Sequence, residues 1–122
     1  MTVLVVDDDP GIRDLLTELL EDEGYQVVSA ANGLEAINHL HRGTEHPCVI
    51  LLDLMMPVMN GWQFRTTQQQ DPGLATIPVV VLSARNDIQQ QASLINAAAH
   101  IMKPINLISL LDTVSRYCAD NP

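Results

Sequence analysis

Residues 3–10 read Val-Leu-Val-Val-Asp-Asp-Asp-Pro, and this stretch decides the fold. Its first four residues form a short apolar run rich in β-branched side chains, which predicts a strand buried on both faces. Pro10 suits the first turn of a helix, and Asp9 is expected to cap that helix. The helix is marked by one apolar stripe at helical spacing, which consists of Ile12, Leu15, Leu16, Leu19 and Leu20. Gly24 is expected to end it.

The same change from strand to helix recurs along the chain. The predicted strands are residues 3–6, 25–30, 48–52, 77–82 and 100–102. The predicted helices run from Pro10 to Gly24, from Asn32 to Gly43, around Phe64, from about Asp87 to Ala98 and through residues 107–114. Strands that alternate with helices indicate a parallel sheet covered on both sides. The expected fold class is therefore α/β, a doubly wound five-stranded parallel sheet with five helices.

Composition excludes several classes of protein. The 122 residues suit one globular domain, with 47% hydrophobic and 17% charged residues. No apolar run approaches the ~20 residues of a membrane span, and the acidic N-terminal region does not resemble a signal peptide. We therefore expect a cytoplasmic protein that does not associate with membranes. The formal charge of −9 argues against direct binding of nucleic acid.

The two cysteines and the two glutamine runs are expected to have structural roles. Cys48 and Cys118 are far apart in the sequence and form no metal-binding motif. Because cytoplasmic cysteines are usually reduced, both thiols are expected to be free and to serve in packing. The glutamine runs at residues 68–70 and 89–91 are expected on solvated helix faces.

Polar residues stand at the carboxyl ends of four predicted strands. Residues 7–9 are all aspartate and follow the first strand, Asp53 follows the third, Ser83 the fourth and Lys103 the fifth. Lys103 is also the only lysine in the chain. Doubly wound sheets bind ligands beyond the carboxyl ends of their strands, where the strand order reverses. These side chains are therefore expected to lie together.

Such a cluster favours phosphoryl chemistry. Neighbouring carboxylates repel and raise each other's pKa unless a cation joins them. Mg²⁺ prefers octahedral oxygen ligands, including one or two carboxylates, and often shares phosphate oxygens. A lysine beside it adds a point charge suited to a phosphoryl group, and one carboxylate could attack phosphorus to form an aspartyl phosphate. Taken singly, Asp9 is a helix cap, and Asp7 and Asp8 are polar residues at a strand end; their shared position favours a site.

The residues resemble the receiver domain of two-component response regulators. The resemblance rests on residues 4–9 (Leu-Val-Val-Asp-Asp-Asp), 53–61 (Asp-Leu-Met-Met-Pro-Val-Met-Asn-Gly), 81–84 (Val-Leu-Ser-Ala) and Lys103-Pro104. Their order and spacing match over nearly the whole chain. The resemblance implies a flavodoxin-like sheet with strand order 2-1-3-4-5. It also implies that residues 1–122 form a single receiver domain, with no effector domain in this chain.

The resemblance also implies the chemical roles. Asp53 would accept a phosphoryl group from a phosphohistidine on a sensor histidine kinase or a histidine phosphotransfer protein. Asp8 and Asp53 would bind Mg²⁺ directly, together with the main-chain carbonyl of Met55, and Asp7 would act through a coordinated water. Mn²⁺ is expected to substitute. Lys103 would pair with the phosphoryl oxygens.

The implied output is a change in binding. Ser83 would bond to the phosphoryl group and pull its loop inward, and His100 lies where the family places a rotating switch residue, more often Tyr or Phe. The Lys103–Pro104 bond would be cis. The surface of the fourth helix, fifth strand and fifth helix would repack and change its affinity for an output protein, an effector domain or, in a homodimer, another receiver. Such a protein is not an enzyme beyond its own phosphotransfer and autodephosphorylation. Asn96 replaces the family's usual glycine at a helix-to-strand turn, where Asn tolerates a left-handed conformation.

Two other classes of function stay open on the sequence alone. Asp7 and Asp9 after an apolar strand resemble the nucleophile motif of haloacid-dehalogenase-type phosphohydrolases, which would carry the phosphate on Asp7. Against this, Pro10-Gly11 departs from that motif, and the chain leaves little room for a cap domain. The other class is a pseudo-receiver, a phosphorylation-independent binding module of the same fold. The complete set of Asp53, Ser83 and Lys103 argues against it.

Overall fold

The computed structural model describes residues 1–43 and 45–119. The strands are β1 (Thr2–Val6), β2 (Gln26–Ala30), β3 (Val49–Asp53), β4 (Val79–Ser83) and β5 (Ala99–Met102). The helices are α1 (Pro10–Asp22), α2 (Gly33–Arg42), α3 (Gly61–Gln70), α4 (Ile88–Leu94) and α5 (Leu107–Tyr117). All neighbouring strands are parallel, in the order β2-β1-β3-β4-β5. The predicted fold class and strand order are confirmed.

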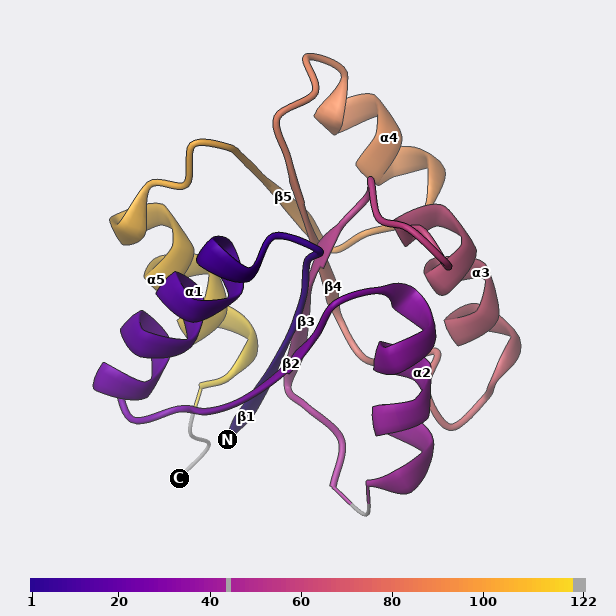
Figure 1. The fold of residues 1–122 in the computed structure, drawn as a ribbon, viewed down its shortest axis with the longest axis horizontal. Helices are drawn as coiled ribbons and strands as arrows, with labels where there is room; N and C mark the ends of the chain where they lie inside the picture. The colour runs from indigo at the N-terminus through magenta and orange to yellow at the C-terminus, as the bar shows by residue number, and fades with distance from the viewer. Residues whose placement is uncertain (44, 120–122) are drawn as a thin grey trace.

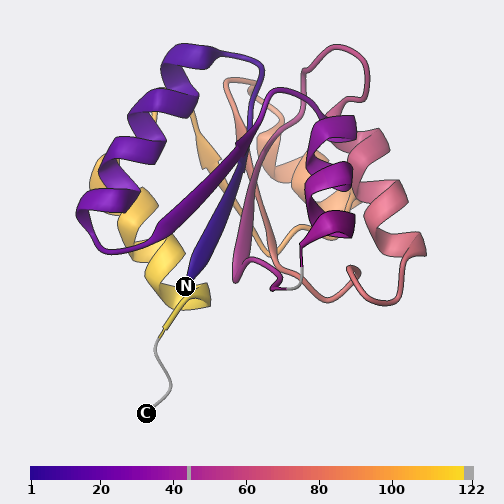
Figure 2. The ribbon, with the colours of Figure 1, turned by 60° about the horizontal axis from the view of Figure 1, so that its bottom comes forward.

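Helices cover both faces of the sheet, as Figures 1 and 2 show. Helices α1 and α5 lie on one face, and α2, α3 and α4 lie on the other. Successive strand residues point to opposite faces, so Val3 and Val5 pack with α1 and α5 while Leu4 and Val6 pack with α2 and α3. This two-sided burial explains why β1 is a continuous apolar run. Among the described residues, no helix has the length and apolar character needed to cross a membrane.

Short polar side chains begin the helices where the sequence predicts. Asp9 Oδ1 accepts a 2.8 Å bond from the backbone N–H of Gly11 and so caps α1. Asn32 caps α2 in the same way, and Asn60 and Gln63 form a reciprocal capping box at α3. Gly24 follows α1 with φ = 93°, a conformation that glycine adopts without strain.

Helix α4 is shorter than predicted. The expected helix reaches Ala98, whereas the structure ends it at Leu94. The reason is Asn96, whose φ of 54° turns the chain toward β5 and agrees with the expected tolerance of Asn for the left-handed region. The Arg65 side chain donates hydrogen bonds to the carbonyls of Ile95 and Asn96, at 2.8 and 2.9 Å. These bonds satisfy the carbonyls at the end of the helix.

Gln68 is fully buried, which contradicts its expected place on a solvated face. Its amide nitrogen donates to the carbonyls of Leu74 and Ile77, and its Oε1 accepts a 2.8 Å bond from Arg65 Nη1. The buried residues of α3 follow one helical face at i, i+3, i+4 and i+7, namely Gly61, Phe64, Arg65 and Gln68. The spacing of apolar residues alone does not reveal this face, because two of its four residues are polar.

The two cysteines form a disulfide, so the expectation of free thiols is wrong. Cys48 precedes β3 and Cys118 caps the end of α5; their Cα atoms are 5.3 Å apart although 70 positions separate them in the sequence. This Cα separation suits a disulfide. The pairing depends on the complete topology, because α5 must fold back over the sheet before its last turn reaches the start of β3. Sequence spacing therefore does not reveal it.

Replacing Arg65 with Met should destabilise the protein by about 2–4 kcal/mol, because buried acceptors on α3 and after α4 lose their donors. Desolvation lowers the pKa of Arg65, which means that burial disfavours its charged form. The hydrogen bonds that Arg65 donates offset this cost. The matched control is Arg116→Met, which removes an exposed ion pair with Asp112 and should change stability by less than about 1 kcal/mol. Urea unfolding followed by circular dichroism measures both. Equal losses in the two variants would refute a special role for Arg65.

Candidate functional site

The predicted polar cluster assembles at the carboxyl ends of the strands. Carboxylate oxygens of Asp7, Asp8 and Asp53 lie within 4.8 Å of one another. Lys103 Nζ lies 2.9 Å from Asp7 Oδ2 and 3.8 Å from Asp53 Oδ1. Ser83 ends β4 beside them, and its carbonyl accepts a 2.9 Å bond from the backbone N–H of Lys103. Asp9 is a helix cap, as its position before Pro10 suggested.

Asp7 is held rigidly inside the protein. It is 0% exposed, and both carboxylate oxygens are occupied: Oδ1 accepts a 2.9 Å bond from the backbone N–H of Asp9, and Oδ2 accepts from Lys103. Its carbonyl accepts a 2.7 Å bond from Arg13 Nη1. No sequence pattern marks Arg13, which lies on an ordinary first turn of α1. Asp7 is therefore a fixed negative charge at the base of the cluster, while Asp8 is exposed.

Asp53 is a buried carboxyl with few stabilising partners. It is 6% exposed, and Oδ1 accepts a long 3.4 Å bond from the backbone N–H of Met55. Burial, and then the negative charge of Asp7, raise the pKa of Asp53 from 3.8 to about 6, although Lys103 and the Met55 N–H oppose the change. The ionised form is thus costly here, and a bound cation would relieve that cost.

The loop after Asp53 folds back tightly on the end of β3. A Cβ at Gly61 would lie 2.6 Å from the Asp53 carbonyl oxygen and 2.7 Å from Leu54 Cα, so only glycine fits. Val58 in the same loop has φ = 69°, which is strained for a β-branched residue. Close packing and local strain therefore occur beside Asp53, where the backbone must hold one geometry.

Ser83 connects the cluster with both neighbouring loops. Its side chain is nearly inaccessible, and Oγ accepts a 3.1 Å bond from the backbone N–H of Arg85. Its carbonyl bonds to Lys103, which begins the connection from β5 to α5. A displacement of Ser83 would therefore pull on the segments that precede α4 and α5.

A polar network beyond Ser83 is not marked by any sequence motif. The Arg85 guanidinium pairs with Asp87 at 2.8 Å and lies 5.7 Å from the centre of the Trp62 ring. Gln91 donates to Asp87 and accepts a 2.9 Å bond from Trp62 Nε1. Hydrogen bonds from Arg85 and then Gln91 hold the pKa of Asp87 well below its usual range. The network ties the start of α4 to α3.

The remaining predicted residues lie around the cluster. The Met55 side chain is 58% exposed at its edge. His100 is exposed on β5, outside the cluster, and borders a cavity of about 370 Å³. The Lys103–Pro104 peptide bond is cis.

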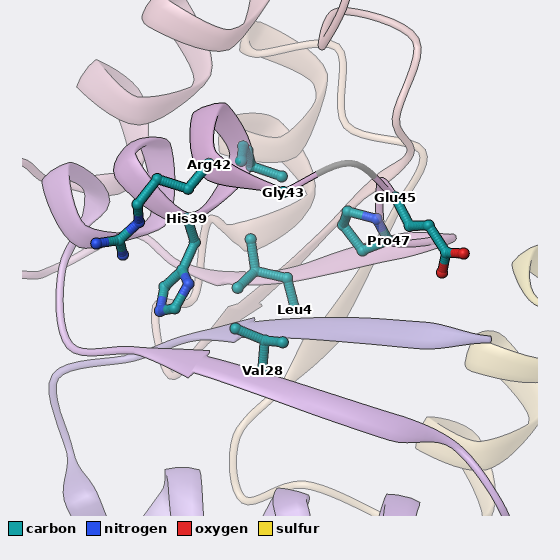
Figure 3. A pocket seen from close by; sticks show the side chains of 8 residues that line it. Leu4, Val28, His39, Arg42, Gly43, Glu45 and Pro47 are labelled. Carbon is teal, nitrogen blue, oxygen red and sulfur yellow. The ribbon is translucent and has the colours of Figure 1, made fainter.

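A second cavity, at the opposite edge of the sheet, lacks convergent chemistry. It measures about 230 Å³ and lies between the end of α2 and strands β1 and β2. Leu4 and Val28 form its floor, and the His39 ring points toward them, whereas the Arg42 and Glu45 side chains extend to opposite sides (Figure 3). The charged groups do not face one point, so the carboxylate cluster is the better candidate site.

Comparison with known proteins agrees with this geometry. The response regulator receiver domain family matches residues 3–115. Sporulation initiation phosphotransferase F of Bacillus subtilis is 32% identical over 94% of this chain and 91% of its own. The structure of chemotaxis protein CheY4 of Vibrio cholerae is 31% identical, with a TM-score of 0.85 over 95% of this chain and 97% of that one.

A more distant structure shares the fold. The receiver domain of sensor histidine kinase PA1611 from Pseudomonas aeruginosa, with a magnesium ion in its active site cleft, is 22% identical with a TM-score of 0.85, and the likeness covers 98% of both chains. The family match spans nearly the whole chain, and relatives above 30% identity agree with it. This chain therefore belongs to the response regulator receiver domain family, whose members act as phosphorylation-dependent signalling switches.

Proposed function

We propose that Asp53 is the phosphoacceptor of this switch and that Asp7, Asp8, Ser83 and Lys103 support its phosphorylation. The observation that carries the proposal is the position of Lys103 Nζ, within 4 Å of both Asp7 and Asp53 at the edge where three carboxylates meet. Of the two buried carboxylates among the described residues, Asp53 accepts no side-chain hydrogen bond, and Lys103 Nζ lies 3.8 Å from its Oδ1. Asp7 already uses both of its oxygens.

The reaction follows from the state of Asp53. Its carboxylate oxygen attacks the phosphorus of a phosphohistidine, the P–N bond breaks, and the histidine nitrogen leaves with the bonding electrons. Because burial raises the pKa of Asp53 to about 6, the carboxylate is ionised at neutral pH yet poorly stabilised. The phosphodonor is a sensor histidine kinase or a histidine phosphotransfer protein.

The carboxylate cluster fits Mg²⁺. Its donor set consists of hard carboxylate oxygens from Asp7, Asp8 and Asp53, which suit a small divalent cation. Asp8 and Asp53 are proposed as direct ligands with the Met55 carbonyl, and Asp7 as a ligand through water; Mn²⁺ is the expected substitute. When bound, the ion supplies positive charge for the transferring phosphoryl oxygens.

Lys103 would supply a second positive charge beside Asp53. Its ammonium already spans Asp7 and Asp53, so it needs only a small movement to pair with a phosphoryl oxygen on Asp53. The Lys103 side chain is 18% exposed, which strengthens such a pairing relative to one in open solvent. Asp7 holds the ammonium in this position before phosphorylation.

Ser83 carries the change away from Asp53. Its Oγ accepts a bond from Arg85, which leaves the hydroxyl proton available for a phosphoryl oxygen. Movement of Ser83 toward that oxygen would draw in the Arg85 segment, and through Asp87 and Gln91 it would strain the contacts of α4. The phosphoryl group thereby shifts the balance between two arrangements of this loop.

The proposed output surface is the α4-β5-α5 face. Its exposed large apolar side chains include Leu94 on α4 and Met102 on β5, and Ser109 and Thr113 of α5 line the cavity beside Met102. His100 lies on the same face beside a cavity of about 370 Å³ lined by Ile88, Ile101 and Thr113, among others. Rotation of the imidazole into this cavity would change the surface. An output protein, an effector domain or a second receiver is the expected partner, with neither nucleic acid nor membrane bound directly.

The other two function classes are not favoured. Asp7 is buried and doubly hydrogen-bonded, which does not suit the nucleophile of a phosphohydrolase. A complete acidic cluster with Ser83 and Lys103 does not suit a pseudo-receiver. We therefore propose that residues 1–122 act as one receiver domain without an effector domain among them. We further propose that it works in the cytoplasm and catalyses only its own phosphotransfer and dephosphorylation.

Phosphorylation should depend on Asp53 and Mg²⁺. Wild type incubated with acetyl phosphate and Mg²⁺ should gain one phosphoryl group by intact-mass spectrometry after a rapid quench, and EDTA should prevent the gain. Asp53→Asn should gain none, whereas Asp22→Asn, which alters an exposed carboxylate on α1, should be labelled like wild type. Equal labelling of Asp53→Asn would exclude Asp53, and labelling lost only in Asp7→Asn would support the hydrolase class.

Removing the Asp53 charge should stabilise the metal-free protein at neutral pH. Because the folded pKa is raised from 3.8 to about 6, the folded state retains a proton that the unfolded carboxyl releases, and stability falls as pH rises through that window. The total loss in wild type is about 3 kcal/mol. In EDTA, urea unfolding should therefore show Asp53→Asn to be more stable than wild type above the window, with no such advantage below pH 3.8. Mg²⁺ should stabilise wild type more than Asp53→Asn. If the stability difference between the two proteins did not change with pH, the buried charge of Asp53 would not be its cause.

Lys103→Ala should separate phosphorylation from metal binding. The three carboxylates remain, so Mg²⁺ affinity measured by calorimetry should be largely kept, while the rate of labelling by acetyl phosphate should fall about 10²-fold. Arg116→Ala, which removes an exposed cation on α5, is the control and should leave both unchanged. Loss of the folded circular-dichroism spectrum in Lys103→Ala would instead assign the lysine a structural role.

A further inference from the structure

The Cys48–Cys118 disulfide lies at the amino-terminal edge of the sheet, opposite Asp53. Figure 2 shows the start of β1 and the last turn of α5 together at this edge. The backbone N–H of Cys48 donates a 2.9 Å bond to the carbonyl of Thr2, which fixes Cys48 beside β1. Cys118 is the cap residue of α5, bonded through its N–H to the Val114 carbonyl. The disulfide therefore joins the end of α5 to the start of β3, the strand that ends at Asp53.

The two cysteines of the pair differ in their exposure to solvent. Cys48 is only partly buried. Cys118 is 4% exposed, but it lines a surface cavity of about 470 Å³ between α5 and the α1–β2 turn. Cavities of several hundred Å³ hold small organic ligands. The cavity therefore leads from solvent to Cys118, and Cys48 is partly exposed beside β1.

We propose that Cys48 and Cys118 form a reversible thiol–disulfide couple, through which small-molecule thiols and disulfides control the attachment of α5 to the sheet. The cytoplasmic placement in the proposed function bears on this point, because disulfides in that compartment are usually transient and sense redox state. A buried, inaccessible disulfide would serve only stability. This one has a partly exposed Cys48, and its Cys118 ends a helix of the proposed output face.

The exchange balances with a glutathione-type disulfide as oxidant. The Cys48 thiolate attacks one sulfur of the small disulfide, forms a mixed disulfide and releases one glutathione thiolate. The Cys118 thiolate then attacks the Cys48 sulfur, closes the protein disulfide and releases the second glutathione. The protein dithiol loses two electrons and two protons, and the glutathione disulfide gains them and becomes two glutathione thiols. Reduction runs the same steps in reverse.

The expected structural effect is confined to α5. Leu110 and Val114 bury the inner face of this helix against the sheet, so the helix should stay docked after reduction while its last turn becomes free. Ser109 and Thr113 of the same helix line the cavity beside His100 on the proposed output surface. The couple therefore sets how firmly the helix that carries this surface is held.

The test compares wild type equilibrated with glutathione disulfide and with reduced glutathione. After denaturing alkylation, mass spectrometry should show no labelled thiol in the oxidised monomer and two in the reduced one, with conversion in both directions. The oxidised form should melt several degrees higher and protect the amides of the last turn of α5 from hydrogen exchange. Cys48→Ser and Cys118→Ser, two independent variants, should resemble reduced wild type in both buffers.

Several results would overturn the proposal. The first is two free thiols after full oxidation, or disulfide-linked dimers or glutathione adducts in place of the intramolecular disulfide. The second is a disulfide that excess reduced glutathione does not reduce. The third is identical hydrogen exchange of the α5 amides in the oxidised and reduced forms. Acetyl phosphate labelling of Asp53 is measured in parallel on both forms. Loss of labelling in both would defeat the proposed phosphorylation without altering the thiol result, so the two failures are distinguishable.

Discussion

The ion pair between Lys103 and Asp7, 2.9 Å long, is the contact on which the carboxyl edge of the sheet depends. Asp7 is 0% exposed, and a buried carboxylate is strongly unfavourable unless it is paired and hydrogen-bonded. Two further carboxylates lie within 4.8 Å of it, so their repulsion adds to that cost. Lys103 offsets part of this electrostatic cost, because its ammonium pairs with the Asp7 carboxylate.

Parallel register explains how the four elements reach one another. Val6 pairs with Leu52, and the residues that follow them are Asp7, just after β1, and Asp53, the last residue of β3. Ser83 pairs with Met102, and the residue after Met102 is Lys103. Asp7, Asp53, Ser83 and Lys103 thus each stand within one residue of a paired strand end. A register shift of one residue would turn every side chain of that strand to the other face, and it would also move the polar residue at the strand end away from its partners in the cluster.

Much of this arrangement is predictable from the sequence, and the exceptions share a cause. Continuous apolar runs and helix caps place the elements, and the polar strand ends bring Asp7, Asp53, Ser83 and Lys103 to one edge. The sequence does not reveal the burial of Gln68, the early end of α4 or the disulfide. Each of these depends on partners far away in the chain: Gln68 bonds to the α3–β4 loop, Arg65 holds the carbonyls after α4, and Cys118 meets Cys48 only after α5 docks. Local periodicity contains no information on such partners.

Residues at both edges of the sheet hold helix α5 in place. Lys103 lies just before α5 and is held by Asp7 and by the carbonyl of Ser83. Cys118 ends α5 and is bonded to Cys48. The helix is therefore attached to the sheet at both of its ends, in each case by a group that chemistry can change. A phosphoryl group on Asp53 would compete for Lys103 at the first attachment, and reduction would open the second. Since Asp53 and Cys48 stand at opposite ends of β3, one rigid central strand separates the two events, and α5 is the element that would combine them.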